Sequence, residues 1–68
     1  MELQPHQQRV VTEKGELDEK IGKLFGFITS ENFEAIVPQD ERYRLTLQYN
    51  VMMAYSKVLE MRIEAFGC

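Results

Sequence analysis

The apolar residues of this chain recur in two long segments, and their spacing is the feature that most constrains the fold. In the first segment they are three, four or seven residues apart, and the set is Val10, Leu17, Ile21, Leu24 and Ile28. This spacing is typical of one face of an α-helix. Pro5 suits the first position of a helix. We therefore predict a helix from about residue 5 to about residue 29, with a bend or break near Gly15 that leaves a short N-terminal helical segment.

The only candidate connection between elements is the stretch 29–40. Ser30 is of a type that favours the N-cap position of a helix. We expect it to cap a short turn in which Phe33 and Ile36 fold back onto the core.

A second helix is predicted to begin at Pro38 and to end at Gly67, the residue types that favour those two positions. Asp40 and Glu41 complement the positive N-terminal end of its dipole. Both helices reach roughly 35–40 Å at about 1.5 Å per residue. Two helices of matched length with a short connection predict an all-α fold, an antiparallel helical hairpin.

The second helix has more apolar surface than a hairpin can bury. One stripe faces the first helix and consists of Leu45, Met52, Leu59, Ile63 and Phe66. A second stripe consists of Leu47, Val51, Ala54, Val58, Met61 and Ala65. Together they cover about half of the helix surface, whereas one partner helix needs roughly 100° of it. We expect the second stripe to contact another copy of the chain.

The size of the chain favours the same conclusion. Its 68 residues form at most one domain, the helical hairpin over residues 1–68, and a domain this small is marginally stable alone. Cys68 is the only cysteine, so an internal disulfide is impossible, and we take it as an incidental free thiol. His6 is the only histidine, which leaves no structural zinc site. We therefore expect a helical homo-oligomer.

Three glycines interrupt the first helix at Gly15, Gly22 and Gly26. Each costs roughly 0.5–1 kcal/mol relative to alanine in a helix interior. Their spacings of seven and four place them on one narrow stripe. Two interpretations remain open: close packing against another helix, or exposed backbone that a ligand approaches.

Charge and composition exclude several functions. The net charge is −3 and the pI is near 5.0, which argues against binding to duplex DNA or RNA. No apolar run is long enough to span a membrane and no signal-peptide pattern occurs, so we expect a cytoplasmic protein. The sequence has no catalytic constellation, metal-ligand spacing or phosphate-binding loop. It therefore predicts a protein that is not an enzyme and has no cofactor or metal.

Gln48, Tyr55 and Arg62 form a third row on the second helix, spaced by seven. In one interpretation Tyr55 packs its ring while Arg62 pairs with a carboxylate such as Glu13. In the other, Arg62 holds an anion, preferably a phosphate, whose geometry suits its planar fork.

The first helix offers a matching charged set of Glu13, Glu16, Lys20 and Lys23, and Lys14 intrudes on its apolar seam. This set is either a solvated face with pairs such as Glu16–Lys20 or the other wall of an anion site.

Two motifs resemble a known family. The first is His6-Gln-Gln-Arg9-Val-Val-x-Glu13-Lys-x-x-Leu17-Asp-x-Lys20-Ile-x-Lys23-Leu, followed by Phe-Ile. The second is Arg44-Leu-x-x-Gln48-x-x-x-Met52-x-x-Tyr55-x-x-x-Leu59-x-x-Arg62-Ile-x-x-Phe66. In this order they resemble the anti-CBASS cyclic-oligonucleotide sponges of phages, which share a hairpin domain with the Thoeris anti-defence sponges.

The resemblance implies a compact helical oligomer, commonly a hexamer, in the cytoplasm of an infected bacterial host cell. Such proteins bind cyclic di- and trinucleotides, or cyclic ADP-ribose-type signals, without cleaving them. Removal of the messenger stops the immune effector and protects the phage.

The resemblance also implies binding sites between protomers. Matched residue by residue, the phosphate ligands are Arg9, Lys20, Lys23 and Arg62. Tyr55 is then a wall or a hydrogen-bond donor, and His6 stands where an aromatic residue would stack on a base. Gly22 and Gly26 would receive a neighbouring helix or a nucleotide ring.

Two other functions compete with this one. The first is a small helical adaptor or assembly factor without a small-molecule ligand. The second is a cyclic-nucleotide phosphodiesterase, which the sequence disfavours because it has neither a metal site nor a pair of general bases.

Overall fold

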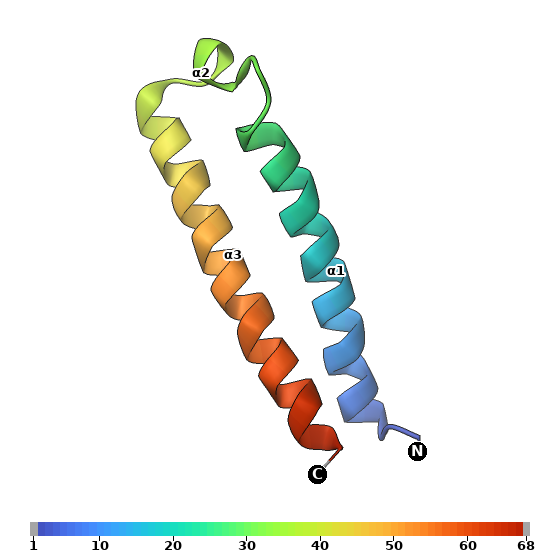
Figure 1. Ribbon diagram of the computed structural model, residues 1–68. Helices are drawn as coiled ribbons and strands as arrows, with labels where there is room; N and C mark the ends of the chain where they lie inside the picture. The colour runs from blue at the N-terminus through green and yellow to red at the C-terminus, as the bar shows by residue number, and fades with distance from the viewer. Residues whose placement is uncertain (1, 68) are drawn as a thin grey trace.

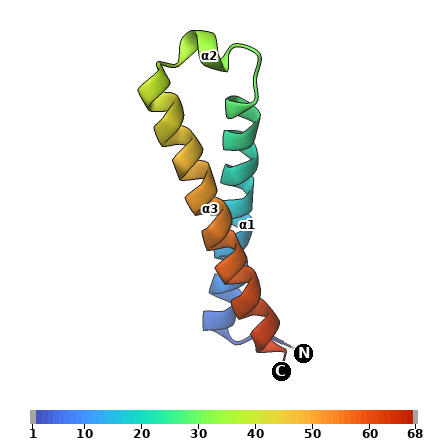
Figure 2. The same ribbon diagram turned by 60° about the vertical axis from the view of Figure 1, so that its left-hand side comes forward.

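The computed structural model describes residues 2–67, which form an antiparallel pair of long helices joined at one tip (Figure 1). The helices are α1 (Pro5–Ile28), α2 (Phe33–Ile36) and α3 (Gln39–Phe66). Both views show α1 and α3 side by side, α2 at the tip and both chain ends at the opposite end (Figures 1 and 2). The molecule is a rod of 49 × 14 × 14 Å. The all-α class and the packing of the two long helices are confirmed; Cys68 lies outside the described residues.

Helix α1 runs without interruption through Gly15, so the predicted break there, which would leave a separate N-terminal helical segment, is wrong. The buried residues Val10 and Leu17 lie on either side of Gly15 and pack into the same core cluster. This packing offsets the low helix propensity of one glycine, as tertiary contacts commonly do. The N-terminus is closed by the Gln4 backbone N–H, which donates to Gln7 Oε1 at 2.9 Å.

The tip differs from the prediction in two ways. Ser30 does not cap α2: its hydroxyl donates to the Phe27 carbonyl at 2.7 Å and closes the end of α1 instead. Phe33 is buried as expected, with its ring edge-on to Phe27 at 5.4 Å, but Ile36 is 68% exposed. A single helical turn has only one inner side, and Phe33 and the following Val37 occupy it.

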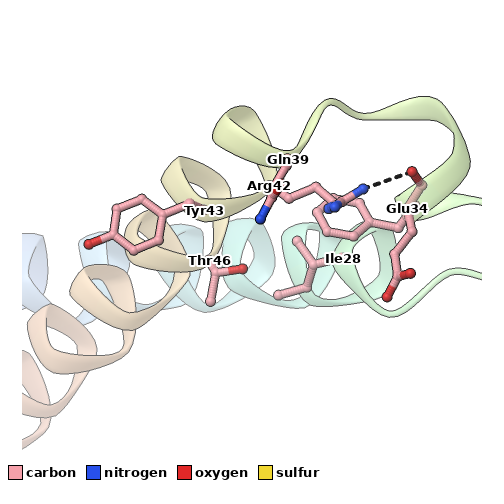
Figure 3. A pocket seen from close by; sticks show the side chains of 7 residues that line it. Ile28, Glu34, Gln39, Arg42, Tyr43 and Thr46 are labelled. Carbon is pink, nitrogen blue, oxygen red and sulfur yellow. Dashed lines mark hydrogen bonds between the residues drawn. The ribbon is translucent and has the colours of Figure 1, made fainter.

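Helix α3 begins after Pro38 and reaches Phe66, with Gly67 at its C-cap, as predicted. Arg42 in its first turns reaches back over the tip. Its Nη1 donates to the Glu34 carbonyl at 2.8 Å (Figure 3). The same atom donates to the Val37 carbonyl at 3.1 Å, and the two bonds fasten α2 to α3.

The core lies between α1 and α3 and is strongest away from the tip. Its buried members are Val10, Leu17, Ile21 and Leu59, and the partly buried residues around them are Tyr49, Met52, Ile63 and Phe66. Leu59 is the most enclosed, at 0% exposure. The α3 residues of this set extend the predicted inner stripe by Tyr49, and the buried Ser56 lies in the same row.

Within residues 2–67, no segment covers the second stripe of α3. Leu47, Val51, Val58 and Met61 are between 49% and 60% exposed. Each of these residues follows a seam-facing residue by two positions, which is about 200° further round the helix. They therefore lie on the side of α3 that faces away from α1.

Candidate functional site

The seam between α1 and α3 has two flanks, and one of them is closed by contacts. On this locked flank, Ser56 donates its hydroxyl proton to Asp18 Oδ1 at 2.5 Å. Further along, the Phe25 and Tyr49 rings lie with their centroids 5.7 Å apart. Asp18 and Phe25 each follow an apolar seam residue of α1 by one position, which defines the side of α1 that they occupy.

The opposite flank collects most of the predicted site residues. In α1 these residues come one or four positions before a seam residue, and in α3 they come four positions before one. The locked-flank residues of α1 come after a seam residue instead, so the two sets lie on opposite sides of the seam. Because the two helices run antiparallel, the corresponding positions of both fall on the same side. We call this surface the open flank; it comprises His6, Arg9, Glu13, Glu16, Lys20, Lys23, Gln48, Tyr55 and Arg62.

The cross-seam contacts also set the levels along the open flank. Ser56 is level with Asp18, and Tyr49 with Phe25. Counting along both helices from these pairs places Arg62 beside the turn of α1 that carries Arg9 and Glu13.

By the same count, the turn with Glu16 and Lys20 lies beside Tyr55. Lys23 lies near the level of Gln48. Along this stretch Arg9 and Arg62 lie at one end, Lys20 lies beside the ring of Tyr55, and Lys23 lies at the other end.

The cations of the open flank are largely unpaired. Within residues 2–67, Arg9, Lys20 and Arg62 have no carboxylate oxygen within the 4.0 Å of an ion pair. The pairs Arg62–Glu13 and Glu16–Lys20, considered from the sequence, do not form among these residues. Lys23 has one weak pair with Glu19 at 3.5 Å, and both side chains are well exposed. An unpaired guanidinium or ammonium is free to make the charge-assisted hydrogen bonds that bind phosphate or carboxylate.

Tyr55 and His6 are accessible beside these cations. Tyr55 is 43% exposed rather than packed into the seam. His6 lies exposed in the first turn of α1. Their rings are available to a planar group, and within residues 2–67 neither ring stacks on another aromatic ring.

Gly22 and Gly26 do not join the open flank: Gly22 follows the seam residue Ile21 by one position, toward the locked flank, and Gly26 lies on the side of α1 that faces away from α3. A Cβ atom added at either position would meet nothing within 4 Å. Close packing of these glycines within the hairpin is therefore excluded. Whatever approaches the bare backbone must come from outside the protomer.

Two hollows among the described residues lie elsewhere. One is lined by Gln39, Asp40, Tyr43 and Arg44. The other lies under Arg42 beside α2 and is lined by Ile28, Phe33, Glu34, Gln39, Arg42, Tyr43 and Thr46 (Figure 3). Both are shallow and open, and neither includes a predicted site residue. Neither hollow therefore belongs to the open flank.

A polar cluster at the seam is a feature that the sequence analysis did not identify. The Lys14 ammonium donates to Asp18 Oδ2 at 2.7 Å and to Ser56 Oγ at 3.2 Å. The Lys14 ammonium and the Ser56 hydroxyl, in that order of importance, lower the pKa of the Asp18 carboxyl. The available signal was the seven-residue spacing that places Ser56 in line with Tyr49 and Ile63.

The fold and the open flank together define a class of protein: a small helical hairpin that presents unpaired cations and an uncovered apolar face. Within residues 2–67, no helix is both long and apolar enough to cross a membrane. The same residues contain no group of three or more His, Cys, Asp or Glu side chains suited to a metal ion.

The chain belongs to the Sequestin family, whose model matches residues 4–65. No curated protein and no solved structure matches it. The match spans α1, α2 and nearly all of α3, so it covers the first motif whole and the second except its last residue, Phe66. The family's name is compatible with a protein that sequesters another molecule.

Proposed function

We propose that this protein binds cyclic di- and trinucleotide immune messengers and sequesters them without cleaving them, as a phage anti-defence protein in the cytoplasm of the infected host cell. The observation that supports this most is the open flank, where Arg9, Lys20 and Arg62 lack carboxylate partners within the described residues. Membership of the Sequestin family and the resemblance to messenger sponges agree with it.

The phosphates of the messenger are the groups that the unpaired cations suit. Arg62 offers a planar fork to two phosphate oxygens, and Arg9, on the neighbouring turn of α1, adds a second guanidinium. Lys20 and Lys23 supply point charges further along the flank. Tyr55 lies between these groups, where its ring forms a wall for a base or its hydroxyl donates a hydrogen bond.

A second copy of the chain completes each site in this proposal. One flank is an open surface, and ligand pockets normally enclose most of a small ligand. The exposed stripe of Leu47, Val51, Val58 and Met61 lies next to the α3 side of the open flank and suits another protomer. Packing along this stripe would bring a second flank toward the first. The assembly we propose is a homo-oligomer, a hexamer by the resemblance.

The test is a depletion and recovery experiment. Purified protein is incubated with cyclic GMP–AMP or a cyclic triadenylate, and free ligand is measured after ultrafiltration. The protein is then denatured and the ligand is measured again by mass spectrometry. A sponge depletes the ligand and returns it intact.

Two other outcomes contradict the proposal. Permanent loss of intact ligand identifies an enzyme. No depletion across cyclic dinucleotides, cyclic trinucleotides and cyclic ADP-ribose signals favours the adaptor function, in which the exposed α3 stripe binds protein and the flank binds nothing. Bovine serum albumin at equal mass controls for adsorption.

A further inference from the structure

Each long helix carries one hydrophilic side chain in the middle of its seam-facing row. In α1 it is Lys14, between Val10 and Leu17. In α3 it is Ser56, between Met52 and Leu59. The observed register brings these two residues together, with Lys14 Nζ 3.2 Å from Ser56 Oγ and Asp18 bonded to both.

The repeating apolar residues of the two seam rows do not by themselves select this register. The seam rows of both helices repeat every seven residues, so sliding α3 by seven residues past α1 again places apolar side chains opposite apolar side chains. Such a slide is about 10 Å along the axis. The connection at 29–38 could span it, since ten residues reach roughly 30 Å when extended.

The polar residues do distinguish the registers. After a slide of seven, Asp18 would lie level with Tyr49 or Ile63 in place of Ser56. Ser56, now 9% exposed, would bury its hydroxyl against apolar side chains without this acceptor. An unsatisfied buried hydroxyl is costly, and a single polar position in an apolar seam is a known way to specify register in paired helices.

We infer that the Lys14–Asp18–Ser56 cluster selects the register of α1 against α3. The register decides which α3 residues stand beside which α1 residues on the open flank. In the observed register Arg62 lies beside Arg9, and a slide of seven would separate them. This consequence for ligand binding rests on the proposed function; the register itself does not.

The test measures the register without any ligand. Spin labels are attached at Thr12→Cys on α1 and Asn50→Cys on α3, both exposed positions, with Cys68→Ser to avoid a third label. Labelled chains are diluted into unlabelled protein, so that pulsed electron–electron double resonance reports the distance between the two labels of one chain. We expect one distance for this parent, and a second population displaced by about one seven-residue slide in Lys14→Met/Ser56→Ala.

A matched control removes a lysine ion pair outside the seam. Lys57 pairs with Glu60 at 3.0 Å on the exposed surface of α3, so Lys57→Met should leave a single distance. If circular dichroism shows that the double variant does not fold, Ser56→Ala alone carries the measurement, with a smaller second population expected. A single unchanged distance in the folded variant would overturn the inference and assign the register to the packing of Phe33 and Val37 at the tip.

Discussion

The two long sides of α3 look alike in sequence and differ in the structure. The seam-facing side buries Leu59 completely and satisfies its one small polar residue, Ser56, through Asp18. The outward side repeats apolar residues just as regularly, yet Leu47 and Val51 remain about half exposed or more. Arg62, at the edge of the outward side, has no ion-pair partner within residues 2–67. Folding of the hairpin explains the apolar residues of the seam side only. The exposed apolar residues of the outward side therefore point to a contact outside the protomer.

The largest expected effect comes from the same truncation made on each side. Leu59→Ala leaves a cavity in the core and should lower the free energy of unfolding by about 2–5 kcal/mol, enough to unfold much of so small a domain. Leu47→Ala should lower the free energy of unfolding by less. Its effect should depend on protein concentration, because Leu47 becomes buried only when protomers assemble. Urea unfolding at two protein concentrations measures both. A cost below about 1 kcal/mol for Leu59→Ala would remove it from the core.

The second prediction breaks the outward side alone. Val51→Glu places a carboxylate in the uncovered stripe, where an unpaired charge cannot be buried without a large cost. The oligomer should dissociate, while helix content stays close to that of the parent because Val51 is 60% exposed in the protomer. Light scattering measures the mass against the 8.0 kDa of one chain.

Asn50→Glu is the matched control, since it adds the same charge at an exposed position of α3 outside the stripe. A Val51→Glu variant that assembles like the parent would show that the stripe is not the interface. A parent that is already an 8.0 kDa monomer at micromolar concentration would contradict the assembly altogether.

The third prediction concerns Arg62. Arg62→Ala should weaken binding of the messenger that uses it by about 10–150-fold, the equivalent of about 1.5–3 kcal/mol for a charge-assisted hydrogen bond. Arg62→Lys should recover part of the affinity, because it keeps the charge and loses the fork. Isothermal titration with cyclic di- and trinucleotides measures this, and the oligomer should survive both changes.

A structural role for Arg62 predicts the opposite pattern. The alanine variant would then lose thermal stability without any ligand present. Lys57→Ala, on a different side of α3, controls for the loss of one positive charge. Unchanged affinity for every cyclic nucleotide would exclude Arg62 from the site, and loss of one ligand class alone would assign Arg9, Lys20 and Lys23 to a separate pocket.

A smaller effect is expected on the glycine side of α1. Gly26→Leu should stabilise the isolated protomer by roughly 0.5–1 kcal/mol through helix propensity, since the new side chain meets open space. If a ligand or a second protomer approaches this backbone, the same change should weaken binding. Melting temperature and ligand affinity are measured together, and Gly15→Leu serves as the comparison further along the stripe. A higher melting temperature with unchanged affinity would mean that these glycines face solvent.

The smallest effect is the pH dependence of the locked flank. The pKa of Asp18 is lowered in the folded state, so its contribution to stability is present above its unfolded pKa and is lost as the pH falls through the folded value. Asp18 is 46% exposed, and solvent screening keeps this contribution modest. Melting curves between pH 6 and pH 2 should therefore converge for the parent and Asp18→Asn at the acid end. Parallel curves throughout would contradict the role of the carboxylate.

Several features of the fold followed from the sequence because they are local. Helix periodicity, Pro5, Pro38 and Gly67 were sufficient to place both long helices to within one or two residues. The tip was harder to predict, because the Ser30 hydroxyl can either bond to the end of the preceding helix or cap the following one. Ile36 and Val37 are equally apolar neighbours. Only the path of the chain between α1 and α3 decided which of them is buried.

The sequence by itself determined the hairpin and the surplus of apolar surface on α3, because both depend on a repeat that can be counted along one chain. The tertiary structure decided which residues meet across the seam. The Lys14–Asp18–Ser56 cluster joins positions 38 and 42 residues apart, and Arg62 lacks the carboxylate that the sequence offered in Glu13. Pairings of this kind depend on register and on the rotation of each helix, which the spacing of residues within either helix does not specify.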